Sequence, residues 1–178
     1  MRIYRRRSFW WVGIIFGFFS GLIVFLFQLL LFHLSTNTFS PVYLIIYLIP
    51  FIAMSMAARR LRERYGEGVL GFGQGFRLSV LTGFVSAGIM SVMVYFIYSE
   101  LFESALQLRA SQLHASLVSE NPGMDFNLMK QRKDLISKLL SPVSLAIYYF
   151  VIQIVLAPVL AFFIAIFAMR RRRDITDI

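Results

Sequence analysis

Residues able to carry out acid–base or metal chemistry are sparse in this sequence. It has no cysteine, which excludes disulfide bonds, thiolate catalysis, iron–sulfur clusters and zinc sites with cysteine ligands. The two histidines, His33 and His114, lie far apart, and no second metal ligand accompanies His33. No HExxH sequence or nucleophile-elbow motif occurs. We therefore expect no enzyme, no metal centre and no cofactor, and we assign no catalytic residue.

Four acidic side chains, Glu100, Glu103, Asp125 and Asp134, are the remaining candidates for acid–base work. They lie in a polar segment with amphipathic spacing, where acidic residues commonly solubilise a helix or form ion pairs. The long apolar stretches contain no Lys, Arg, Asp or Glu. Because ion-coupled transporters generally need such a group inside the membrane, this pattern disfavours a pump or a secondary transporter.

The segment from Gly66 to Phe76 is the most distinctive local sequence, because glycine recurs along it. Glycine-rich loops can hold phosphate groups, but this one matches neither GxxxxGK[ST] nor GxGxxG, and no strand precedes it. A nucleotide site is therefore disfavoured. A close-packed interfacial segment that leads into a helix is the favoured interpretation.

The composition indicates what kind of protein must position these residues. Hydrophobic residues make up 58% of the 178 and charged residues 15%, against roughly 45–50% and about 25% in soluble domains. A soluble fold of this size cannot bury so much apolar surface. The apolar runs do not alternate as barrel strands would. We therefore expect an integral membrane protein of the all-α class.

Four apolar stretches are long enough to be considered as transmembrane helices. Each lacks charged side chains. The second is close to the lower length limit for a span, and the first is far too long for the apolar region of a signal peptide. The predicted spans are residues 9–34, 42–58, 78–98 and 143–169.

Basic residues alternate between the two sides of these spans, in a chain with 18 basic and 9 acidic residues and a net charge of +9. By the positive-inside rule, we expect a multi-pass protein of the inner membrane with both termini in the cytoplasm. The cytoplasmic parts are then an Arg- and Gly-rich loop, residues 59–77, and a basic tail, residues 170–178. Residues 99–141 are expected to face outward.

The outward segment has leucines at helical spacing on both sides of a turn signal at Asn121-Pro122-Gly123. We expect the third span to continue as a helix beyond the membrane, and a second helix to return and break at Ser141-Pro142. The two arms either pack only on each other or present a face to a partner protein. The residues expected on that face are Leu106, Leu113, Leu128 and Leu135.

A stripe of three glycines, Gly13, Gly17 and Gly21, follows one face of the first span. Glycine lets helix backbones approach closely in a membrane. The stripe is either a homodimer seam or a contact with another span of the same chain. We favour the second interpretation.

Four arginines, Arg59, Arg60, Arg62 and Arg64, precede the glycine-rich segment. In a soluble protein such basic density suggests a nucleic-acid partner. Beside a membrane span it fits anionic lipid headgroups, at about 1 kcal/mol per residue, or the acidic face of a partner. We therefore expect contacts with headgroups or a partner protein, and none with nucleic acid.

The sequence GFGQGF, entering an apolar span, resembles the hallmark of one membrane family. A long outward helix with Glu and Gln, Pro142 before the last span and terminal basic residues fit the same pattern. The family is called domain of unknown function four-one-nine-nine and is common in Bacteroidota. The resemblance is best from about Arg59 to Arg172, and Gly75 stands where the family often has Ala. The motif residues are Gly71, Phe72, Gly73, Gln74, Gly75 and Phe76.

The resemblance implies four membrane helices in the inner membrane and no established activity. Members of the family are often encoded beside membrane glycosyltransferases. The resemblance therefore suggests a membrane glycosyltransferase as a partner.

Two functions remain open. The favoured one is a non-enzymatic accessory or scaffold subunit that binds another inner-membrane protein through its spans and outward hairpin. The other is a small transport or flippase-type helper for a lipid-linked substrate. Purification in mild detergent would separate them, because the first requires a stoichiometric protein partner and the second a copurifying polyprenyl lipid.

Overall fold

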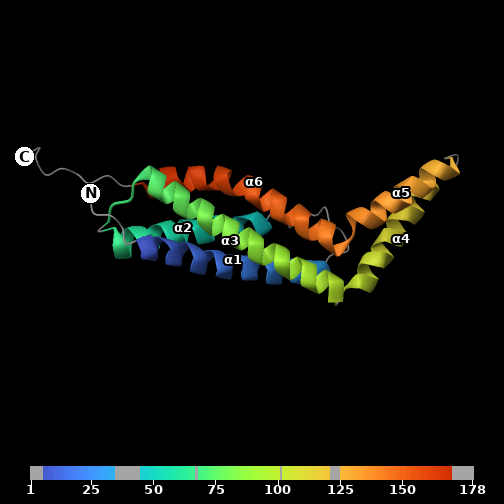
Figure 1. Ribbon diagram of the computed structural model, residues 1–178, viewed down its shortest axis with the longest axis horizontal. Helices are drawn as coiled ribbons and strands as arrows, with labels where there is room; N and C mark the ends of the chain where they lie inside the picture. The colour runs from blue at the N-terminus through green and yellow to red at the C-terminus, as the bar shows by residue number, and fades with distance from the viewer. Residues whose placement is uncertain (1–5, 35–44, 67, 101, 121–124, 170–178) are drawn as a thin grey trace, which may run out of the picture. The chain divides into compact units, whose positions relative to one another are not determined.

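The computed structural model describes residues 6–34, 45–66, 68–100, 102–120 and 125–169. This part of the chain is built from α-helices joined by short connections (Figure 1). The expected all-α class is thereby confirmed for the described residues. The helices are α1 (Arg6–Leu34), α2 (Ile45–Tyr65), α3 (Phe72–Glu100), α4 (Glu103–Glu120), α5 (Phe126–Leu139) and α6 (Pro142–Ala168).

Three stretches of helix are long and apolar enough to cross a membrane. They are Arg7–Leu31, Phe72–Glu100 and Pro142–Ala168, with mean hydropathies of 2.5, 2.0 and 2.8. A helix of 25 residues is about 38 Å long, which exceeds a hydrocarbon core of about 30 Å. These three helices correspond to the predicted spans 9–34, 78–98 and 143–169.

Helix α2 differs from the sequence-based expectation in two ways. It is not among the helices of spanning length and apolarity, and the first residues of the predicted span 42–58 lie outside the described part. It also continues to Tyr65, whereas a loop was expected over residues 59–77, and α3 already begins at Phe72. The helix continues through residues 59–65 because this segment contains neither proline nor glycine. An ion pair between Arg59 and Glu63, one turn apart, also favours the helix.

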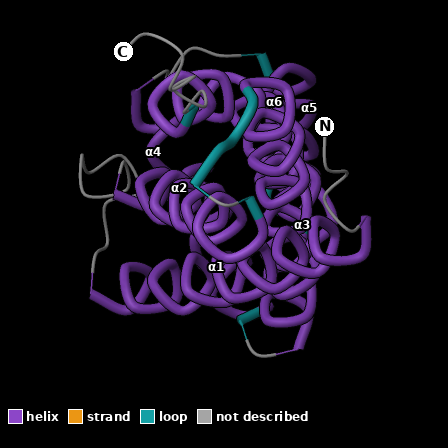
Figure 2. Tube along the Cα trace, turned by 90° about the vertical axis from the view of Figure 1, so that its left-hand side faces the viewer, coloured by secondary structure: helices purple, strands orange, loops and turns teal. Residues whose placement is uncertain are grey.

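The chain forms two compact units. The first comprises Met1–Met90 and Phe150–Ile178, and it contains α1, α2, the first part of α3 and the last part of α6. Figures 1 and 2 show these helices side by side. The second, Ser91–Tyr149, contains α4, α5 and the adjoining ends of α3 and α6.

In the first unit, α1 and α3 run in the same direction. The glycine stripe of α1 faces α3, with Gly13 beside Leu81 and Gly21 beside Ile89. Residue numbers increase in the same direction along both helices from one contact to the next, so α1 and α3 are parallel.

Helix α6 runs opposite to α3. Gly75, near the start of α3, lies beside Ala165, near the end of α6, and Gly83 lies beside Ala157. Helix α2 runs with α6, because Arg62 near its end contacts the carbonyl of Ala168 at the end of α6. The first unit is therefore an up-down-up-down bundle.

The glycine stripe of α1 allows backbone contact with α3. A Cβ atom on Gly17 would lie 2.7 Å from the carbonyl oxygen of Thr82, and one on Gly21 would lie 2.7 Å from that of Ser86. Real Cβ atoms are essentially never found that close to another atom. Between these contacts, the Ser86 hydroxyl donates a hydrogen bond of 3.2 Å to the Ser20 hydroxyl. The stripe therefore packs within the chain.

A second contact of small residues, which was not predicted from the sequence, joins α3 to α6. A Cβ atom on Gly83 would lie 2.7 Å from the Cβ of Ala157 and would also meet the Met54 side chain of α2. Small residues on neighbouring helices allow such close packing in a membrane. The members, at four-residue intervals, are Gly75, Ser79 and Gly83 on α3, and Ala157, Ala161 and Ala165 on α6.

The outward faces of the bundle are apolar as well as its core. Trp11 and Phe18 on α1, and Val155 and Phe167 on α6, are exposed large hydrophobic side chains. A water-soluble bundle would place polar residues on these faces. Exposed apolar faces on helices of this length fit a lipid environment.

The second unit contains the antiparallel pair α4 and α5. Helix α3 ends at Glu100 and α4 begins at Glu103, so the expected continuous helix is interrupted there. Helix α6 starts at Pro142, where the Ser141 hydroxyl accepts a hydrogen bond of 3.2 Å from the Ser144 amide. Ser141 is thus the N-cap, and proline occupies the first helical position, where no amide donor is needed. The expected turn at residues 121–123 lies outside the described residues.

We expect Gly17→Ala to destabilise the bundle by about 1–3 kcal/mol, because the added methyl group forces α1 away from the α3 backbone. Gly88→Ala is the matched control, since a Cβ there meets no described atom within 4 Å and alanine favours the helix. Thermal unfolding of both variants in detergent measures the difference. Equal stability of the two would contradict the close α1–α3 contact.

Candidate functional site

One end of the first unit gathers the basic side chains. Helix α2 ends there, α3 begins there and α6 ends there, as the contacts of Arg62 with Ala168 and of Gly75 with Ala165 show. We call this region the basic end. Its described arginines are Arg7, Arg59, Arg60, Arg62, Arg64 and Arg77.

Arg59 is paired with an acidic neighbour on its own helix. Its Nε donates a hydrogen bond of 2.8 Å to Oε1 of Glu63. This bond is the main reason that the pKa of Glu63 is lowered and the pKa of Arg59 is raised. The pair is solvent-exposed and contributes little to stability. Its effect is that Arg59 is partly neutralised.

Arg62 has a structural position. Its side chain is 17% exposed, and Nη1 donates to the carbonyl oxygen of Ala168 at 3.4 Å. The last carbonyls of a helix lack partners within the helix and carry the negative end of its dipole. A guanidinium there satisfies one of them and connects α2 to α6.

Arg60 and Arg64 are the exposed members of the predicted cluster that have no hydrogen bond or ion pair with another described residue. Arg77 at the start of α3 is also exposed. Nη2 of Arg62 also lies 3.6 Å from Oε1 of Glu63, so Arg59 and Arg62 are both ion-paired with this carboxylate. Two of the four predicted arginines, Arg60 and Arg64, therefore remain available to an external anion.

The GFGQGF motif forms the start of α3. Oε1 of Gln74 accepts a hydrogen bond of 3.3 Å from the Gly71 amide, and the Gly71 carbonyl accepts one of 3.1 Å from the Gln74 amide. The first bond is one half of a capping box with Gly71 as the N-cap residue, and the second is a backbone bond of the first turn, because glycine has no side chain to supply the other half. The motif therefore has a local structural task, which is to begin a helix at the basic end.

The same motif attaches α3 to α6. Phe72 stacks on Phe76 with a centroid distance of 6.1 Å, and its ring meets the edge of Phe162 at 5.9 Å. A Cβ atom on Gly75 would lie 3.6 Å from the Cα of Ala165, which is an ordinary contact. Alanine can therefore stand at position 75.

The predicted partner face of the hairpin is only partly exposed. Leu113, Leu128 and Leu135 are exposed, whereas Leu106 is 6% exposed and cannot belong to an open face. Leu139 is exposed and was not predicted. On α5, Leu128, Leu135 and Leu139 share one side of the helix because they recur at helical spacing. We call these three residues the leucine face.

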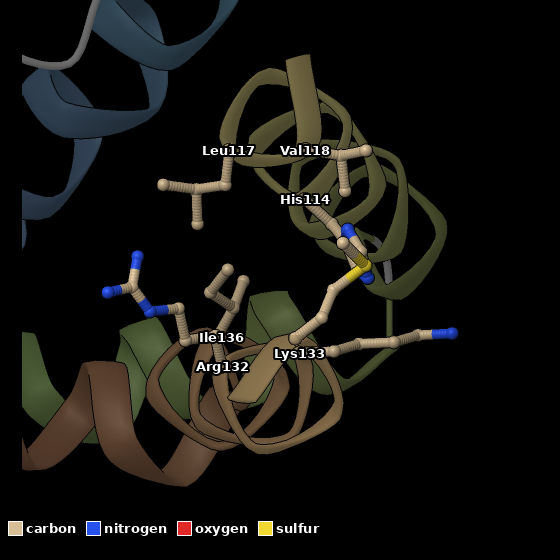
Figure 3. A pocket seen from close by; sticks show the side chains of 7 residues that line it. His114, Leu117, Val118, Arg132, Lys133 and Ile136 are labelled. Carbon is tan, nitrogen blue, oxygen red and sulfur yellow. The ribbon is translucent and has the colours of Figure 1, made fainter. Parts of the chain in front are cut away.

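The seam between α4 and α5 lies beside this face. Figure 3 shows Leu117 and Ile136 pointing toward one another, while Arg132 and Lys133 extend to opposite sides. A hollow of about 380 Å³ lies along the same pair of helices. Its lining includes Gln107, Ser111, His114, Lys133 and Ser137.

The polar atoms of this hollow suit binding better than catalysis. The hydroxyls of Ser111 and Ser137 donate to carbonyl oxygens of their own helices, at 2.7 and 2.9 Å. Toward a ligand, these two hydroxyl oxygens therefore act as hydrogen-bond acceptors. Lys133 supplies a positive charge. Within the described residues, no three His, Asp or Glu side chains come together as a metal site would require.

We expect Arg62→Gln to lower the free energy of unfolding by about 0.5–1.5 kcal/mol, because it removes the hydrogen bond to Ala168. Arg60→Gln is the matched control and should leave stability unchanged. Unfolding in detergent measures both. In native mass spectrometry the order should reverse, with Arg60→Gln losing more bound anionic lipid. A stability loss equal in both variants would be inconsistent with the capping role.

No curated protein and no solved structure matches the chain. Residues 12–170 match the sequence model of the family described as "Protein of unknown function (DUF4199)". This confirms the family to which the GFGQGF motif pointed. Because the match extends over far more than half of the sequence, the chain belongs to this family.

Proposed function

We propose that the protein is a non-enzymatic accessory subunit of the inner membrane that binds another membrane protein through its hairpin. The observation that carries this proposal is the leucine face on α5. Leu128 and Leu135 are 52% and 58% exposed, although leucine at helical spacing normally lies in a helix interface. Burying one leucine side chain contributes about 1.5–3 kcal/mol of favourable free energy. A partner that covers the leucine face therefore stabilises its own complex with the hairpin.

The partner is expected to combine an apolar stripe with acidic residues. By helical spacing, Arg132 and Lys138 are the charged residues of α5 that lie nearest to the leucine face, whereas Lys130 lies on the opposite side of the helix. Opposite charges at the rim of an interface guide association and fix its register. A membrane glycosyltransferase, which the family resemblance suggests, is one candidate.

Four spans are part of the proposal, with α2 as the second. Parallel α1 and α3 lie side by side in the first unit, so the chain has to return to its starting side between them. The charge-free part of α2, residues 45–58, is about 21 Å long, and the predicted span 42–58 adds three residues before it. Neighbouring helices also bury Met54, Ala57 and Leu61 of α2. Less of the surface of α2 therefore faces lipid, so the helix needs fewer apolar residues than a fully exposed span.

The orientation follows from the basic end. Arginines concentrate where α2 ends and α3 begins, and the positive-inside rule places such a concentration in the cytoplasm. Both termini are then cytoplasmic, and the connection between the third and fourth spans, which contains α4 and α5, faces outward.

We expect reporter fusions after Ile178 and at Asn121 to give opposite sidedness, the first cytoplasmic and the second outward. An alkaline phosphatase and green fluorescent protein pair measures this, because each is active on one side only. A fusion after Ser40, between the first two spans, should report the same side as Asn121. If the Ser40 and Asn121 fusions report opposite sides, α2 does not cross.

We expect the double substitution Leu128→Ser and Leu135→Ser to abolish copurification of the partner, because it removes two apolar contacts from the leucine face. The matched control is Leu128→Met with Leu135→Met, which conserves volume and apolarity. Both proteins are purified from native membranes in mild detergent and compared by quantitative mass spectrometry. Equal recovery of every partner would remove the leucine face from the proposal.

The second candidate function, a helper for a lipid-linked substrate, is favoured by the hollow along α4 and α5. Its volume of about 380 Å³ and its mixture of Lys133 with serine and glutamine side chains suit a polar anionic headgroup. The purification described above discriminates between the two candidates. A copurifying polyprenyl lipid without a stoichiometric protein would favour the helper.

A further inference from the structure

Positive charge at the basic end exceeds what the first unit can neutralise. Glu63 is the one acidic side chain among the described residues of this unit, and Arg59 and Arg62 both pair with it. Three further arginines are exposed and have no hydrogen bond or ion pair with a described residue, namely Arg60, Arg64 and Arg77. Their counterions therefore come from outside the described part of the chain.

Helix contacts place two of these arginines at one depth in the bundle. The antiparallel helices α2 and α3 meet where Met54 lies beside Gly83. Arg60 on α2 and Arg77 on α3 are each six positions from their own helix's member of this contact. Each therefore lies about 9 Å from the contact toward the basic end, and Arg64 lies about 6 Å farther out.

Both tryptophans of the protein lie at nearly the same depth on α1. Trp10 and Trp11 come just before Gly13, which lies beside Leu78 of the parallel helix α3. They are therefore level with Arg77 to within about one helical turn. Their side chains are 48% and 64% exposed. Tryptophan is enriched where a membrane meets water, so this depth has the composition of a membrane surface.

The apolar length of the helices agrees with a membrane surface at this depth. A hydrocarbon core of about 30 Å corresponds to about twenty helical residues. Counted from Arg77 along α3, this length ends at Ile97, shortly before Glu100. Counted from Trp10 along α1, it ends at Leu30. No charged side chain lies within either length.

The two helices direct their arginines into one layer from opposite sides. In an α-helix each Cα–Cβ bond tilts toward the N-terminus of the helix. Because α3 begins at the basic end, Arg77 leans outward, and because α2 ends there, Arg64 leans back toward the membrane. The layer between them is about 6 Å deep, which resembles the headgroup region of one leaflet, about 5–8 Å.

We propose that this layer binds the phosphates of anionic phospholipids in the leaflet that surrounds the basic end. We call it the headgroup belt, and it consists of Trp10, Trp11, Arg60, Arg64 and Arg77. A guanidinium can donate two hydrogen bonds to one phosphate. The exposed apolar faces of the bundle continue directly below the belt, so lipid is the neighbour that brings phosphate to this depth. The belt does not involve the leucine face, and it fixes how deeply the bundle sits in the membrane.

Tryptophan fluorescence measures the depth of the belt, because positions 10 and 11 hold both tryptophans of the protein. The protein is reconstituted in vesicles of phosphatidylcholine and phosphatidylglycerol that carry a quencher either beside the headgroup or at the end of an acyl chain. We expect the headgroup quencher to be the more effective of the two. Stronger quenching from the end of the acyl chain would overturn the proposal.

Native mass spectrometry in detergent tests the charge of the belt. Arg77→Gln should weaken the binding of phosphatidylglycerol about fivefold and that of phosphatidylcholine less than about twofold. Arg77→Lys should retain most of the affinity, because it keeps the charge. Lys130→Gln is the matched control, since it removes one exposed charge from α5 and should change neither affinity.

Two results would contradict the headgroup belt. One is an unchanged affinity of Arg77→Gln for phosphatidylglycerol, and the other is an equal loss for both lipids, which would indicate a damaged fold. Recovery of a partner through the leucine face is measured separately, so the failure of one proposal leaves the other standing.

Discussion

The structure depends on how closely two helix backbones can approach α3. On one side, Gly17 places α1 against the carbonyl oxygen of Thr82, and on the other, Gly83 places α6 against Ala157. Lipid chains are as apolar as leucine side chains, so burial of apolar area gives little preference for helix association inside a membrane. Dispersion contacts between closely spaced atoms favour helix association instead, and their energy declines steeply with distance. Small residues on both sides of α3 therefore hold the bundle together.

This constraint also determines what the basic end can do. Because Gly75 seats the start of α3 against Ala165, the last turn of α6 lies where Arg62 can cap it. The hydrogen bond from the Gly71 amide to the Gln74 side chain caps the start of α3 at the same end. Arg59 and Arg62 both pair with Glu63, and Arg62 also donates to the carbonyl of Ala168, which leaves Arg60 and Arg64 for external anions. Local charge density in a sequence therefore overstates the charge that a surface presents.

The features that could be predicted from the sequence are those marked by particular residue types, such as long apolar runs and regularly spaced glycines. Length and apolarity located α1, α3 and α6, and regular glycines located the contact face of α1 but did not identify α3 as its partner. The contact of α3 with α6 was missed because alanine and serine are common in every apolar helix and mark no particular face. The helical continuation of α2 was missed because charged residues were interpreted as a loop. Leu106 was placed on the open face because spacing alone does not distinguish the inner side of a hairpin from the outer side.

The bond between Arg62 and Ala168 has a consequence for biosynthesis. Its partners are 106 residues apart, and Ala168 is near the end of the chain. At roughly 5–20 residues per second, a ribosome needs on the order of 5–20 s to make that intervening length. During this interval the guanidinium has Glu63 beside it as a counterion but no carbonyl of α6 to cap. The contact that joins the end of α2 to the end of α6 therefore forms only after α6 has been made, so it closes the bundle and does not start its assembly.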